Sequence, residues 1–319
     1  MFSITVGVTC KNNARTIKQC IDSILNLNYP KNKYKVFVVD SFSNDGTYEI
    51  LKKYGKVIKL RQVKSNIAGG HNFIIKNSDS EVIALTDADC VVDKNWLGEL
   101  VKPFENREIG AVTGLVKTPK NVNRLQEIIG LELESRYKKF PKFVSRGPTM
   151  NLAFRTKLAK KILFDESYDV AQETEWGYRF TNRYKMVYVP KAIVHHYHRA
   201  TWVGFLKQQF TYAEFVPLVY FKHRNRVLGD HISRPSMLLN IINIYLVFLF
   251  LLLSPIFNIF LYISLAFFIL FFITSIIEFA ASKTKKEYLL PFMLIFLVRT
   301  IVWCVGLFIG MKNLISNKF

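Results

Sequence analysis

The sequence has few cysteines, and their arrangement suggests neither a metal site nor a disulfide framework. The four cysteines lie far apart and no two of them form a C-x-x-C pair (Cys10, Cys20, Cys90 and Cys304). This spacing argues against structural zinc and fits a reducing compartment. Met1 runs directly into a strand-like stretch, so we expect no secretory signal peptide.

Acidic residues are scarce, at 24 Asp and Glu against 44 Lys and Arg, and the formal net charge is +20. Two long stretches, residues 236–253 and 256–277, have no charge at all, and a third apolar stretch, 288–311, is interrupted by Arg299. Each stretch is long enough to cross a bilayer as a helix. We therefore expect three spans, and membrane lipids rather than nucleic acid as the partner of the basic surface.

Basic residues flank the first two expected spans (Arg224, Arg226 and Arg234 before the first; Lys283, Lys285 and Lys286 after the second). Basic flanks favour the cytoplasmic side, so we expect a multi-pass protein of the cell membrane with a cytoplasmic N-terminal part. The third span would then carry the C-terminal tail outward, although Lys312 and Lys318 disfavour that step.

The N-terminal part, which precedes the expected spans, alternates between strand and helix patterns. Apolar runs predict strands, and a helical period of apolar residues predicts helices between them (strands 4–9, 34–39, 57–62 and 82–85; helices 12–27 and 47–53). Such alternation is typical of an α/β fold with a parallel, Rossmann-like sheet. Residues 201–221 mix aromatic and basic side chains, which predicts an amphipathic helix at the membrane interface.

Two aspartates, Asp87 and Asp89, directly follow the strand predicted at residues 82–85. Aspartate is disfavoured inside strands, so both should lie at the carboxyl edge of the sheet, where α/β folds bind ligands. Two carboxylates at this spacing suit Mg²⁺ or Mn²⁺, with the remaining ligands supplied by substrate phosphates.

Six segments, taken in order, resemble family 2 of the GT-A-fold glycosyltransferases over about residues 3–198. They are VGVTCKNNARTIKQCIDSIL, VVDSFSNDGT, NIAGGHN, TDADC, GPTMNLAFR and QETEWGYR. The resemblance implies an inverting transferase that uses a nucleotide-diphospho-sugar. The Q-x-x-R-W signature of processive synthases is missing, since Gln208-Gln209 is followed by Phe-Thr-Tyr.

The resemblance also implies roles for residues of the N-terminal part. Those expected on the nucleotide sugar are Asn12, Asp40, Gly70, His71 and Asp87. The expected metal ligands are Asp87 and Asp89, with His196 or His198 as a third ligand or a phosphate contact. A polar strand end is the alternative for these histidines.

Glu173 is expected to be the general base, because an inverting transfer needs a carboxylate to accept the proton of the acceptor hydroxyl. The alternative is that Glu173 and Glu175 lie on a solvated helix face, and Glu175 could pair with Arg179 one helical turn on. Asn151 and Arg155 are expected on the acceptor side.

Arg299 would lie near the bilayer centre if its helix spans, so it should have a partner or a purpose. We consider two possibilities: a pair with Glu278, or a contact with the phosphate of a lipid acceptor.

The expected organisation is a GT-A domain over residues 1–198, an amphipathic segment over 199–232 and a membrane domain over 233–319. The expected function is sugar transfer to a polyprenyl-linked glycan, a glycolipid or a polysaccharide precursor. The alternative is a catalytically silent membrane scaffold that binds nucleotide sugar.

Overall fold

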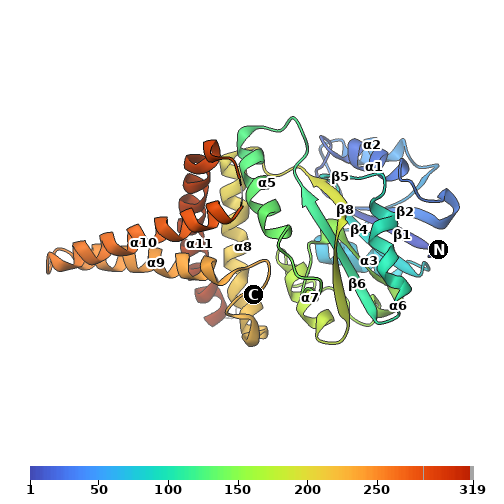
Figure 1. Ribbon diagram of the computed structural model, residues 1–319. Helices are drawn as coiled ribbons and strands as arrows, with labels where there is room; N and C mark the ends of the chain where they lie inside the picture. The colour runs from blue at the N-terminus through green and yellow to red at the C-terminus, as the bar shows by residue number, and fades with distance from the viewer. Residues whose placement is uncertain (283, 317–319) are drawn as a thin grey trace. The chain divides into compact units, whose positions relative to one another are not determined.

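The computed structural model describes residues 1–282 and 284–316 (Figure 1). Lys283 and Lys318, which entered the orientation argument, lie outside the described residues. The chain forms two compact units: Met1–Val122 with Phe140–Tyr197, and Asn123–Lys139 with His198–Phe319. The division differs from the expected one, because residues 123–139 belong with the C-terminal helices rather than with the sheet.

The first unit is built on one eight-stranded sheet with the order β3-β2-β1-β4-β7-β6-β8-β5. The strands are β1 Ile4–Cys10, β2 Tyr34–Asp40, β3 Ile58–Gln62, β4 Val82–Asp87, β5 Cys90–Val92, β6 Ile109–Lys117, β7 Leu152–Arg155 and β8 Lys185–His196. Strands β3, β2, β1 and β4 are parallel. The expected α/β fold is confirmed, but the sheet is mixed rather than parallel throughout, because β7 and β5 run antiparallel to their neighbours.

The register of the parallel strands gathers polar residues at one edge. Thr9 of β1 lies opposite Asp87 of β4, and Cys10 lies opposite Asp40 of β2. The apolar interior of these strands is almost wholly buried, so the aspartates mark the point where the chain leaves the core. The carboxyl ends of β1, β2 and β4 therefore form one side of a site.

The other side of the site is formed by strands that pair in the antiparallel direction. After a short turn that contains Asp89, β5 pairs with the end of β8, and Cys90 lies opposite His196. Strand β7 is antiparallel to β4, so Arg155 lies opposite Val82, at the amino end of β4.

Helices cover the sheet and join its strands. They are α1 Ile17–Leu25, α2 Thr47–Lys52, α3 Ile67–Lys76, α4 Trp96–Val101, α6 Thr156–Ala159 and α7 Gln172–Thr181. Helix α1 begins at Ile17 rather than at Asn12, because Asn12 has a left-handed backbone with φ of 58° and belongs to the preceding loop. Trp176 of α7 stacks on Phe164 and Phe180 and anchors α7 in the core.

The second unit is helical throughout its regular structure. It contains α5 Arg124–Tyr137, α8 Trp202–Lys222, α9 Pro235–Leu253, α10 Ile259–Ser282 and α11 Leu289–Ile315. Three stretches, Pro235–Leu253, Ile259–Ser282 and Lys286–Ile315, are long and apolar enough to cross a membrane. The share of buried residues is 17% in each of the first two but 44% in the third, so the third is the most covered by protein. These helices indicate that the chain is anchored to a membrane.

Candidate active site

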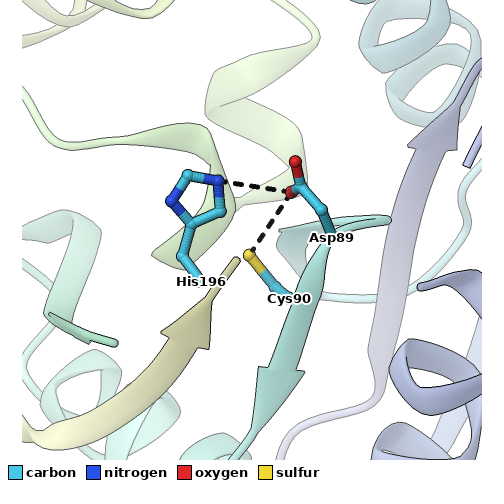
Figure 2. A group of neighbouring side chains, drawn as sticks. All are labelled: Asp89, Cys90 and His196. Carbon is cyan, nitrogen blue, oxygen red and sulfur yellow. Dashed lines mark hydrogen bonds and ion pairs between the residues drawn. The ribbon is translucent and has the colours of Figure 1, made fainter. Parts of the chain in front are cut away.

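The acidic turn between β4 and β5 lies beside the end of β8. Asp89 is in this turn, and its Oδ1 lies 3.5 Å from Nε2 of His196. The thiol of Cys90 lies 3.9 Å from the same oxygen (Figure 2). The backbone N–H of Tyr197 donates to the carbonyl of Asp89, which fixes the turn against β8. The ligand atoms of Asp89, Cys90 and His196 all lie within 4.8 Å of one another.

The carboxylates of this site oppose one another's ionisation. Burial, followed by the charges of Asp89 and Glu173, raises the pKa of Asp87 to about 7, although His196 acts in the opposite direction. Such a raised pKa means that the protein alone does not balance the negative charge gathered here. The acids from two separate segments, the end of β4 with the turn after it and the start of α7, therefore share one electrostatic site.

The chemistry of these groups fits a hard divalent cation. A cation between Asp87 and Asp89 would offset the repulsion that raises the pKa of Asp87. Burial and the two aspartates raise the pKa of the Cys90 thiol well above its usual range, so it stays protonated and is a poor ligand. Mg²⁺ or Mn²⁺, held by the two aspartates with His196 beside them, suits this set better than zinc.

Glu173 lies in the first turn of α7, and its carboxylate is incompletely hydrogen-bonded within the described part of the chain. Its Oε2 is shut off from solvent and has no hydrogen-bond partner among the described residues. Burial raises the pKa of Glu173, while its own backbone N–H and Arg146 pull the other way. An unpartnered carboxylate with a raised pKa is suited to accept a proton.

The neighbouring acid, Glu175, is used differently. Its two oxygens accept from Nε and Nη2 of Arg179, at 2.5 and 2.6 Å, and the side chain is 3% exposed. The expected pair between Glu175 and Arg179 is confirmed, and it removes Glu175 as a substitute for Glu173.

The loops after β1 and β2 interlock. Asn12 is exposed; its backbone N–H donates to Ser43 Oγ and its side-chain oxygen accepts from the N–H of Asn44. Asp40 is fully buried and accepts from the N–H and hydroxyl of Ser43 and from the amide of Gln62. Asp40 therefore orders the loop that presents Asn12, and a contact between either residue and a nucleotide stays a prediction.

Gly70 and His71 lie in the first half of α3. A Cβ at Gly70 would come within 2.8 Å of the Thr9 side chain, so this glycine lets α3 approach β1. His71 is fully buried, and burial lowers its pKa to about 3, so the ring is neutral. Its Nε2 lies 3.3 Å from the Thr9 hydroxyl. A neutral, buried ring cannot offset phosphate charge as a cation would, and a contact between His71 and the nucleotide sugar stays a prediction.

The two residues expected on the acceptor side have structural roles. Asn151 is fully buried; it accepts from the indole N–H of Trp96 and donates to the carbonyls of Leu115 and Ala192. Arg155 donates to three carbonyls, those of Phe104, Asn106 and Ile109. It also lies at the opposite edge of the sheet from Asp87, because β7 is antiparallel to β4. Both side chains thus stabilise the fold, and an acceptor contact for either residue stays a prediction.

Arg299 pairs with Glu132 rather than with Glu278, and a contact between Arg299 and a lipid phosphate stays a prediction. Its Nη1 lies 3.1 Å from Oε2 of Glu132 on α5, and Arg136 Nη2 lies 2.6 Å from the same oxygen. Glu278 instead accepts a hydrogen bond from Ser236. The Arg299–Glu278 pair was therefore wrong, because a helix far away in sequence supplies the counter-ion.

Sequence reasoning missed two residues near the acids. Cys90 was dismissed with the other cysteines, although its place directly after the D-x-D could have drawn attention to it. Arg146 donates to the hydroxyl of Thr174 at 2.8 Å and is 8% exposed, and its charge reaches Glu173. No periodic or motif signal marks Arg146, since it lies in an irregular segment.

Comparisons with known proteins agree with this architecture. The chain is 29% identical over 119 residues to the glycosyltransferase AglE of Haloferax volcanii, a match that covers 36% of this chain and 39% of that protein. It is 32% identical over 116 residues to a beta-monoglucosyldiacylglycerol synthase of Trichormus variabilis, covering 34% of this chain and 25% of that protein. The chain thus matches less than two thirds of the length of either relative.

A solved structure shares the fold along the whole chain. It is a mannosyltransferase, PcManGT from Pyrobaculum calidifontis, in complex with GDP-Man and Mn²⁺. The superposition covers 100% of this chain and 88% of that one, with a TM-score of 0.61 and 18% identity. Residues 5–167 match glycosyl transferase family 2. These residues are more than half of the chain, and they contain the interlocked loops and the acidic turn between β4 and β5. The chain therefore belongs to glycosyl transferase family 2.

Proposed function

We propose that this protein is a membrane-anchored, inverting glycosyltransferase that moves a sugar from a nucleotide-diphospho-sugar to a lipid-linked acceptor. The observation that carries the proposal is the meeting of Asp87, Asp89 and Glu173 at one sheet edge, with Glu173 Oε2 buried and unpartnered among the described residues. An inverting transfer requires two functions, namely charge compensation for the leaving diphosphate and a base for the acceptor hydroxyl.

The donor would bind with its diphosphate at the acidic turn. Asp87 and Asp89, with His196 beside them, would hold Mg²⁺ or Mn²⁺, which when bound offsets the charge of the departing nucleoside diphosphate. Asn12, in the exposed loop after β1, would contact the nucleotide, and Asp40 would support this loop through its hydrogen bond with Ser43.

Glu173 would take the proton of the acceptor hydroxyl as that oxygen attacks the anomeric carbon. The bond from the anomeric carbon to the diphosphate breaks as the new glycosidic bond forms, and the leaving group departs on the face opposite the attack. Burial raises the pKa of Glu173, which improves the strength of its carboxylate as a base.

The acceptor class follows from the anchoring helices. A catalytic unit tied to three long apolar helices works beside the bilayer, where acceptors carried on lipid are concentrated. The name of the Trichormus relative also includes a lipid, a diacylglycerol. A polyprenyl-linked glycan and a glycolipid both fit this class.

Arg299 is the residue that we propose as a contact for the lipid-linked acceptor. The cluster of Arg136, Glu132 and Arg299 contains two cations and one anion, and all three side chains are at most 11% exposed. Glu278 forms no ion pair with either arginine in the described part of the chain. A buried net positive charge favours an anion nearby, and the phosphate of a lipid-linked acceptor would supply one.

The deciding experiment is a screen of purified protein against a panel of nucleotide sugars, with a lipid extract as acceptor and with Mn²⁺ or EDTA. We expect release of nucleoside diphosphate from one donor, dependent on both metal and lipid. Tight donor binding without release or transfer under any condition would instead identify a silent scaffold that binds nucleotide sugar.

A further inference from the structure

The hairpin of α9 and α10 has the composition of a bilayer segment along its whole length. Residues 236–277 contain no charged side chain, and this stretch includes the turn between the helices. Around that turn, Leu252, Ile256, Phe257 and Tyr262 are all strongly exposed. Exposed apolar surface of this extent belongs in lipid, so the hairpin must enter the bilayer.

Helix α11 is paired lengthwise with α8 rather than with the hairpin. Gly306 and Gly310 lie against the α8 backbone, and a Cβ at Gly310 would overlap the carbonyl oxygen of Glu214. Trp303 donates to Gln209 and Asn313 donates to Glu214. The second half of α11 is therefore held along α8, a helix that also carries Lys207, which is exposed.

The first half of α11 is held by α5. Tyr288, just before α11, donates to Glu127, and the guanidinium of Arg124 lies 4.4 Å from its ring. Farther along, Arg299 pairs with Glu132. If Arg299 lay at the bilayer centre, Glu132 and the charged helix α5 would lie there too, which is incompatible with the polar character of α5. The midpoint of α11 must therefore lie at a depth that tolerates charge.

The hairpin crosses α11 and does not run along it. The hydroxyl of Tyr245, about midway along α9, donates to the carbonyl of Cys304, and Phe279, near the end of α10, packs against Phe292. These contacts therefore lie away from the tip of the hairpin. Farther out, Phe250 packs on Phe260 and Phe267, within the hairpin itself. In Figure 1 the hairpin projects across the direction shared by α8 and α11. Helices that cross in this way cannot all run along the bilayer normal.

We propose that α11 lies in the plane of the membrane interface beside α8, and that only the α9–α10 hairpin enters the bilayer core. Helix α11 would then bind the lipid surface through an exposed apolar stripe on the side opposite Arg299 (Leu290, Leu294, Val305, Phe308, Met311 and Ile315). This apolar stripe would contact the membrane at the boundary between headgroups and acyl chains. The same membrane receives the hairpin, so one bilayer surface accounts for both contacts.

The basic residues agree with this arrangement. A hairpin returns the chain to the side it left, so Arg234 before α9 and Lys285 after α10 lie on one side. With α11 in the interface, Lys312 lies on that side as well. Basic residues at all three places then follow the positive-inside preference, which a third span would violate at Lys312. The proposal does not depend on the donor, acceptor or metal.

Depth measurements on the full-length protein test this arrangement. Leu294 and Phe308 lie on one face of α11, and a spanning helix would separate them in depth by roughly 21 Å. Leu239 and Leu252, which have nearly the same spacing along α9, form the matched control pair. Each residue is replaced by cysteine, labelled with a nitroxide and measured in liposomes by collision with oxygen and with a water-soluble nickel chelate. The four native cysteines are buried, which limits background labelling.

We expect equal depths for Leu294→Cys and Phe308→Cys, and clearly different depths for Leu239→Cys and Leu252→Cys. A depth difference across α11 as large as that across α9 would overturn the proposal. A second measurement uses a membrane-impermeant maleimide on Lys312→Cys, with exposed Lys53→Cys marking the side of the catalytic unit. Labelling of both from the same side agrees with an interfacial α11, and labelling from opposite sides refutes it.

Discussion

Replacement of Glu173 by glutamine tests the central chemical assignment. The change is nearly isosteric, and it removes the only group that we propose as proton acceptor. Donor binding should survive, because the acidic turn that we propose as the metal site is formed by β4, β5 and β8 rather than by α7. The transfer rate should fall at saturating donor and acceptor.

The size of the loss follows from what a general base contributes. Base assistance is worth roughly 10²–10⁴-fold, or about 2.7–5.4 kcal/mol of barrier at about 1.36 kcal/mol per decade. The upper part of this range is expected here, because Glu173 Oε2 is shut off from solvent and water cannot easily replace it.

Stability and pH separate loss of a base from loss of the fold. Because the pKa of Glu173 is raised in the folded state, the native protein binds this proton more tightly than the unfolded chain does. The ionised carboxylate therefore lowers stability as the pH rises above the unfolded-state value. Glu173→Gln should consequently raise the melting temperature at neutral pH while abolishing turnover. In the wild type, kcat should fall as the pH drops through the raised pKa of Glu173.

The assay is transfer of labelled sugar to lipid acceptor at saturating substrates, with donor affinity and melting temperature measured on the same samples. Glu175→Gln is the matched control, because it breaks the pair with Arg179 and should lower stability without removing the base. Undiminished transfer by Glu173→Gln would refute the assignment. A melting temperature well below that of the wild type would mean that the lost rate reflects misfolding.

Predictions for four further substitutions follow from the structure. Asp89→Asn should weaken Mn²⁺-dependent donor binding and abolish transfer while the fold persists; full turnover by this variant, or by wild type in EDTA, would remove the metal role. Glu132→Leu should lower the free energy of unfolding by about 3–5 kcal/mol, because it leaves two buried arginines without a counter-ion. Arg299→Leu should lower it clearly less, because Glu132 still pairs with Arg136. Equal losses of unfolding free energy for the two variants would contradict the net charge assigned to this cluster. Arg299→Leu should also raise the KM for a lipid acceptor without changing donor hydrolysis, and an unchanged KM would make Arg299 purely structural. Gly310→Leu should separate α11 from α8, detected as protease cleavage between the two helices, whereas Gly98→Leu, at an open position, should have little effect.

Local sequence patterns predicted the parallel half of the sheet well. Strands β1, β2 and β4 are short runs of buried residues, and each ends close to the predicted residue. The acidic turn was found because aspartates rarely lie inside strands. Short strand β5 was missed, since so brief a segment gives no period, and its pairing with β8 is what brings Cys90 to His196.

Residues whose roles depend on distant partners could not be predicted in the same way. Arg155 was placed on the acceptor side, but the direction of β7 puts it at the far edge of the sheet. Arg299 was paired with the nearest acid in the predicted spans, yet its partner Glu132 comes from α5, a helix that lies much earlier in the chain. Neither the direction of a strand nor an ion pair between residues so far apart in the chain produces a local pattern in the sequence.

The membership of α5 in the helical unit affects how the chain can be made and shortened. Leu125, Ile128 and Ile129 bury their side chains against Phe292, Phe296 and their neighbours, which are synthesised only near the end of the chain. A nascent chain therefore carries an amphipathic helix with an uncovered apolar face in the middle of its catalytic sequence until α11 has been made. A truncated chain that ends near residue 198 would keep that helix permanently bare. Soluble expression of the catalytic unit would then require polar replacements on α5 as well as removal of the C-terminal helices.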